Sequence, residues 1–197
     1  MELQSYISRP AYLTKVVPFI NKPVIKVFTG QRRSGKSYLL LQTIDYIRKK
    51  YPDSNLIYIN KELPDFNFIK DDETLWSYIR SQHPEGQKAF VFIDEVQEIF
   101  QFEKSLRGLL AAGDFDIYCT GSNATLLSGE LATLLSGRYV EINVHTLSFN
   151  EFLRFHQLDN SVSSLTKYMV QGGMPFLVHL EDNDLVRQEY LRNVLNT

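Results

Sequence analysis

The sequence predicts an α/β fold with a mainly parallel, five-stranded sheet flanked by helices and followed by a small helical lid. Short apolar runs rich in β-branched residues recur along the chain, and helical patterns separate them. After about residue 147 only helical patterns remain. Because strands that alternate with helices favour a parallel sheet covered on both faces, we expect a core over 1–147 and a helical lid over 148–197.

The individual elements follow from local patterns. An amphipathic helix over 9–20, interrupted or ended near Pro18, precedes the first strand, and Gly113 is a plausible stop for a later helix. The expected strands are 24–29, 56–60, 88–95, 115–123 and 138–144. The other expected helices are 36–51, about 72–82, 99–113, a short piece from about residue 124, and three in the lid at 147–156, 163–171 and 184–195.

Composition excludes several classes of protein. The chain has 197 residues, a net charge of -2 and a single cysteine, Cys119, so it has neither a disulfide framework nor a cysteine-based zinc cluster. The charge gives no bulk attraction to nucleic acid or to an anionic membrane. The opening residues MELQSYISRPAYL do not read as a secretion signal, and no apolar run approaches the roughly 18 residues of a membrane-spanning helix. We expect a soluble, cytoplasmic protein with no membrane partner.

The segment GQRRSGKS, residues 30–37, fits the pattern of a phosphate-binding loop, and we call it the phosphate loop. An expected strand precedes it and a helix follows, which is the context that the motif requires. The amides of 34–37 would face the β-phosphate, Lys36 would reach the β- and γ-phosphates, and the Ser37 hydroxyl would bind Mg²⁺. The expected nucleotide-binding residues are Gly30, Gln31, Arg32, Arg33, Ser34, Gly35, Lys36, Ser37 and Tyr38.

Two acids end the strand FVFIDE. Asp94 would hold Mg²⁺, and Glu95 would activate the attacking water, although two acids at this place could also cap the following helix. A GTPase would show Asp-x-x-Gly here and Asn-Lys-x-Asp later. Asp94 is followed by Glu-Val-Gln, and the only Asn-Lys pair, at 60–61, lacks the final aspartate. The nucleotide is therefore expected to be ATP.

Other polar residues have two interpretations each. The strand FDIYCTGSN ends in Thr120, Ser122 and Asn123, and either Ser122 or Asn123 could sense the γ-phosphate or only cap the next helix. Arg138 could stabilise transferring charge in its own subunit or a neighbour's, or form a surface salt bridge. One of Arg32 and Arg33 could be structural and contact the lid.

Six segments taken together resemble a large group of prokaryotic ATP-binding proteins of the AAA-plus type, which carry an uncharacterised C-terminal domain. The segments are VFTGQRRSGKSYLL, FVFIDEVQE, YCTGSNATLLSGE, LSGRYVEI, LSFNEFL and QGGMPFLV, and the resemblance extends from about Arg9 onward. It implies a sensor-bearing strand between the phosphate-loop strand and the Asp94 strand, and a natural protein that continues past Thr197. The chain departs from the AAA-plus pattern in having no clear second-sensor arginine, and Arg187 and Arg192 are candidates by location alone.

The expected function is Mg²⁺-dependent ATP hydrolysis coupled to movement of a C-terminal domain or a partner protein. The alternatives are a nucleotide-binding switch or scaffold with little hydrolysis and, third, a small-molecule kinase. Nucleic acid is not indicated by these residues, and a homo-oligomer stays open.

Overall fold

The fold is a five-stranded, fully parallel sheet with the strand order β2-β3-β4-β1-β5. A computed structural model describes residues 6–84, 86–121, 134–180 and 183–195. The strands are β1 (Ile25–Thr29), β2 (Asn55–Asn60), β3 (Ala89–Asp94), β4 (Phe115–Thr120) and β5 (Tyr139–Asn143). The predicted α/β class is confirmed, and so is the position of β4 between β1 and β3.

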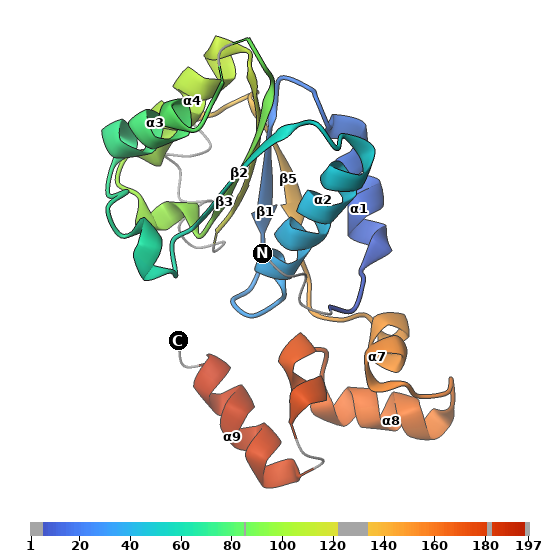
Figure 1. The fold of residues 1–197 in the computed structure, drawn as a ribbon. Coiled ribbons are helices and arrows are strands. Elements are labelled where there is room, and N and C mark those ends of the chain that lie inside the picture. The colour runs from blue at the N-terminus through green and yellow to red at the C-terminus, as the bar shows by residue number, and fades with distance from the viewer. Residues whose placement is uncertain (1–5, 85, 122–133, 181–182, 196–197) are drawn as a thin grey trace.

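Helices cover both faces of the sheet, as Figure 1 shows: α1 (Pro10–Val16) and α2 (Lys36–Lys50) on one face, α3 (Asp72–Ser81) and α4 (Phe102–Ala112) on the other. Strands β1, β3 and β4 are buried along their whole length because both faces of the sheet are covered, and β3 is apolar up to Asp94. In β3, Val91 and Ile93 join the core cluster under α3 and α4, whereas Phe90 and Phe92 join the cluster under α1 and α2. Side chains that alternate between faces therefore give two cores from one strand.

Local signals set the helix ends. Helix α1 has Pro10 at its first position, and α3 is capped by Asp71, which forms a capping box with Thr74. Helix α4 ends at Gly113 in a left-handed conformation, as predicted. It begins later than predicted because Phe100 donates its backbone N–H to the Lys70 carbonyl at 2.8 Å, which keeps this segment extended.

The lid contains α7 (Phe149–His156), α8 (Val162–Gln171) and α9 (Asp184–Leu195), with a 3₁₀ helix over Pro175–His179. These helices lie beyond the carboxyl ends of the strands (Figure 1), and Met174, Leu177 and Val194 form their small apolar cluster. Further 3₁₀ helices span Val17–Phe19, Pro64–Phe66 and Val96–Glu98. Within the part of the chain that the structure describes, no helix is long and apolar enough to cross a membrane.

Candidate nucleotide-binding site

The phosphate loop connects β1 to α2, and two glycines allow its path. Gly30 has φ 142°, and a Cβ there would lie 2.2 Å from the Val144 carbonyl oxygen. Gly35, with φ 97°, is the N-cap of α2, and no side chain caps the helix. The first amides of α2 therefore have no partner within the helix and are available to an anion. The Ser34 amide, by contrast, already donates to the Gln31 carbonyl at 3.2 Å.

Lys36 lies almost buried in the concave side of this loop. Its Nζ donates to the Gly30 and Gln31 carbonyl oxygens, each at 3.1 Å. Burial lowers the pKa of Lys36, while Glu95 and Asp94 oppose that shift. The ammonium is thus held within the loop by carbonyl groups that a phosphate oxygen could replace as its acceptors.

Asp94 and Ser37 are brought together although they are 57 positions apart. The Ser37 Oγ donates to Asp94 Oδ1 at 3.0 Å, and the Thr120 hydroxyl donates to the same oxygen. Asp94 is 1% exposed, and its Oδ2 has no hydrogen-bond partner in the described structure. Burial raises the pKa of Asp94 despite these two hydrogen bonds.

This pair fits Mg²⁺. A hydroxyl and a carboxylate are hard oxygen ligands of the kind that the ion prefers, and the partnerless Oδ2 is a buried oxygen that a cation or its water shell would satisfy. The described residues contain no cluster of three or more His, Cys, Asp or Glu that could hold a metal. That agrees with the usual Mg²⁺ site, in which water and substrate phosphates supply the other ligands.

Glu95 follows Asp94 at the end of β3, in a left-handed conformation with φ 56°. Its backbone N–H donates to the Thr120 hydroxyl at 2.9 Å, and the Gln97 side chain donates to its carboxylate. A non-glycine residue in this region of backbone space is strained by about 1–3 kcal/mol, so its neighbours must hold it there. Thr120 and Gln97 therefore fix both the backbone and the carboxylate of Glu95.

The remaining loop residues lie in different settings. Arg33 has φ 63°, and its guanidinium carbon lies 5.4 Å from the ring centroid of Tyr190 in α9, which supports the interpretation that a loop arginine contacts the lid. Tyr190 in turn stacks on Phe176 at 5.1 Å. The side chain of Ser34 is buried, whereas Gln31, Arg32 and Tyr38 are exposed.

The other predicted site residues are Ser122, Asn123 and Arg138, and the described structure shows none of them at the loop. Ser122 and Asn123 lie outside the described residues. Arg138 is exposed, and its carbonyl accepts from the Ile25 N–H at 2.8 Å, so it is level with the start of β1. The phosphate loop follows the other end of β1, about 13 Å away along the strand. Within one chain the structure therefore does not bring Arg138 to the loop.

The two lid arginines differ in burial. Arg187 is 9% exposed and lines a cavity of about 90 Å³ formed by lid residues, among them His156, Lys167 and Gln171. Arg192 is exposed on α9.

Sequence reasoning missed two residues that organise the site. It treated Thr120 only as a polar end of its strand, yet this hydroxyl contacts both Asp94 and the backbone of Glu95. It gave Arg9 no role, yet Arg9 Nη1 donates to the Ser34 carbonyl at 3.0 Å. The pairing of β3 with β4 was a usable signal for Thr120, whereas no spacing in the sequence points to Arg9.

Comparison with known proteins gives relatives over nearly the whole chain. A protein of Haemophilus influenzae, described only as uncharacterized, is 40% identical over 185 residues, which are 91% of this chain and 46% of that protein. The uncharacterized protein MJ1544 of Methanocaldococcus jannaschii is 33% identical over 193 residues, or 92% of this chain and 41% of that protein. The chain thus spans less than half the length of these relatives.

Solved structures share the fold at low sequence identity. Hsp104 of S. cerevisiae, in a casein complex, has a TM-score of 0.61 at 11% identity, covering 99% of this chain and 39% of that one. Domain III of the replication initiation protein DnaA from Thermotoga maritima has a TM-score of 0.56 at 16% identity, covering 95% and 88%. A family model described as an AAA domain matches residues 22–153, and the chain therefore belongs to the AAA domain family.

Proposed function

We propose that this chain binds ATP with Mg²⁺ at the phosphate loop and hydrolyses it. The observation that carries the proposal is the hydrogen bond between Ser37 and Asp94 beside the Lys36 loop, with Asp94 Oδ2 buried and without a hydrogen-bond partner among the described residues. Membership of the AAA domain family supports nucleotide binding by this loop. The missing guanine-reading motif favours ATP over GTP.

Each group has a task in this proposal. The amides at the start of α2 and the Lys36 ammonium would bind the phosphates. Ser37 and Asp94 would hold Mg²⁺, which when bound neutralises charge on the β- and γ-phosphates. Glu95 would accept a proton from the attacking water after Gln97 releases its carboxylate oxygen.

The energy of hydrolysis would pass to the lid, and through it to the further sequence that the longer relatives contain or to a partner protein. The Arg33 contact with Tyr190 supports this route, because it joins the phosphate loop directly to α9. A nucleotide-bound switch with slow turnover is the second candidate. The hydrogen bond from Gln97 favours it, since that bond occupies a carboxylate oxygen needed for catalysis.

Steady-state phosphate release tests the proposal. Glu95→Gln should lower the rate by at least about 100-fold, since a general base contributes roughly that much, while ADP still binds. Glu98→Gln, which changes an exposed acid three positions away, is the matched control and should keep the rate. Equal rates for the unsubstituted protein and Glu95→Gln would refute hydrolysis at this site. Tight ADP binding without turnover would favour the switch.

A further inference from the structure

Arg9 is buried at the point where the core, the phosphate loop and the lid meet. It lies immediately before α1, outside the matched AAA region of 22–153, and is 3% exposed. Its Nε lies 2.8 Å from Glu151 Oε1 and its Nη2 3.1 Å from Glu151 Oε2, so the two side chains form a bidentate ion pair across 142 positions. Glu151 belongs to α7, the first helix of the lid.

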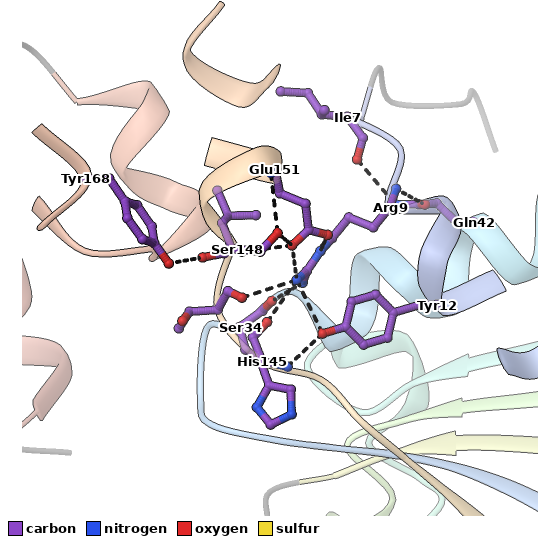
Figure 2. Close-up of polar contacts among 11 residues, drawn as sticks. Ile7, Arg9, Tyr12, Ser34, Gln42, His145, Ser148, Glu151 and Tyr168 are labelled. Atoms are coloured by element: carbon purple, nitrogen blue, oxygen red, sulfur yellow. Dashed lines mark hydrogen bonds and ion pairs between the residues drawn. The ribbon is translucent and has the colours of Figure 1, made fainter. Parts of the chain in front are cut away.

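The same guanidinium reaches the phosphate loop and the connection to the lid. Nη1 donates to the Ser34 carbonyl at 3.0 Å, and Nη2 donates to the His145 carbonyl at 3.0 Å. Figure 2 shows these contacts converging on the guanidinium, with the ring of Tyr12 beside it. The Arg9 backbone N–H is held as well, by Gln42 of α2 at 2.9 Å.

The groups around Arg9 are themselves fixed. Glu151 accepts from the Ser148 backbone N–H at 2.9 Å in the capping box of α7. Burial would raise the pKa of Glu151, but the hydrogen bonds from Arg9 and Ser148 keep it below its usual value. The Tyr12 hydroxyl accepts from the His145 N–H at 3.0 Å. The guanidinium is therefore held by fixed groups on both sides.

The bond to Ser34 has a consequence for phosphate binding. The Ser34 carbonyl and the Gly35 N–H belong to one planar peptide group, and no peptide bond in the described structure is cis. In a trans peptide these two groups point in opposite directions, so a donor that fixes the carbonyl also fixes the direction of the amide. Arg9 thereby orients the Gly35 amide, which belongs to the loop's expected anion-binding set.

We propose that Arg9 is a positioning residue that couples the phosphate loop to the lid through one guanidinium. Displacement of α7 moves Glu151, which moves Arg9 and turns the Ser34–Gly35 peptide. A phosphate bound by the loop acts on α7 by the same route in reverse, since coupling between two sites is reciprocal. This inference rests on the proposed binding of nucleotide.

The test measures ADP affinity by calorimetry and amide hydrogen exchange of 149–156 with and without ADP. In the unsubstituted protein, ADP should slow exchange in α7. Arg9→Lys replaces the planar fork by a single ammonium, so ADP affinity should fall about 10- to 100-fold, as expected for loss of a hydrogen bond to a charged group. Arg154→Lys, at an exposed position of α7, is the control and should behave as the unsubstituted protein.

Glu151→Gln separates coupling from stability. It leaves the Arg9 bond to Ser34 in place, so ADP affinity should stay within about threefold, while the ADP-dependent slowing in α7 should disappear. A response in α7 equal to that of the unsubstituted protein would overturn the coupling, even if Arg9→Lys did not fold. A purely structural Arg9 would lower the melting temperature and leave affinity and response unchanged. Absence of ADP binding by the unsubstituted protein would overturn the proposed function and, with it, this inference.

Discussion

The close approach of Gly30 to Val144, the residue after β5, allows a quantitative prediction for Gly30→Ala. The new Cβ would lie 2.2 Å from the Val144 carbonyl oxygen, whereas ordinary contact begins at 3.4 Å, so the loop and this residue must separate by about 1.2 Å. The Val144 N–H donates to the Thr29 carbonyl at 2.7 Å, which resists that movement. Strain at a positive φ should lower the free energy of unfolding by about 1–2 kcal/mol, and overpacking should lower it by about 1–3 kcal/mol more. The total loss of stability is about 2–5 kcal/mol.

Gly113→Ala is the matched control. Gly113 also has a positive φ, 81°, but a Cβ there meets nothing within 4 Å, so only the strain of about 1–2 kcal/mol applies. At about 2–4 °C per kcal/mol for a chain of this size, Gly30→Ala should melt about 2–12 °C below Gly113→Ala. Phosphate release should fall about 100-fold for Gly30→Ala alone, because a displacement near 1 Å misplaces the loop.

Thermal melts followed by circular dichroism, with a phosphate-release assay on each folded variant, provide the measurement. Equal melting temperatures for the two variants would show that the Gly30 approach does not constrain the loop. So would normal phosphate release by Gly30→Ala.

Three further predictions concern the same region. Because burial raises the pKa of Asp94, the folded chain holds that proton more tightly than the unfolded chain, and stability falls as pH rises above about 4. In urea unfolding without nucleotide, Asp94→Asn should therefore be more stable than the unsubstituted protein at pH 8, by a margin that narrows toward pH 4; a margin independent of pH would contradict this assignment. Thr120→Val should cost about 1–3 kcal/mol and slow phosphate release, and Thr120→Ser should restore both, because the hydroxyl holds Asp94 and the Glu95 backbone. Gly173→Ala would place a Cβ 2.3 Å from the Leu147 carbonyl oxygen, so a thermal melt should show a loss of several degrees, at about 2–4 °C per kcal/mol, and an unchanged melt would count against that contact.

Local patterns were sufficient to predict most of the fold. The apolar runs predicted four strands to within one residue at each end, whereas β4 ends at Thr120, three residues before its predicted end at 123. Strand β3 is buried on both faces, and such a strand leaves a continuous apolar signal. The 3₁₀ helices over Pro64–Phe66 and Pro175–His179 were missed, since one turn is too short to show a period. The delayed start of α4 depends on the contact between Phe100 and Lys70, which no local pattern contains.

The candidate site likewise contains residues that local motifs predict and residues that only the folded structure brings together. Lys36, Ser37, Asp94 and Glu95 belong to short motifs whose residue types follow from phosphate and metal chemistry, so the sequence alone points to them. Arg9 and Glu151 lie 142 positions apart, and their pairing depends on how the lid packs against the core. Such a contact becomes visible only in the folded chain. Arg138 was predicted as a possible phosphate contact, but the register of β5 on β1 places it at the end of β1 opposite the loop.

The strand order determines when the site can form as the chain folds. Strand β1 precedes the phosphate loop, yet its sheet partners are β4 and β5, whose last residues are Thr120 and Asn143. A nascent chain can form α2 early, but β1 gains its second neighbour only after residues up to Asn143 have been synthesised. The phosphate loop thus follows a strand with both sheet neighbours only once β5 has been added, so bound ADP would report completed assembly of the sheet.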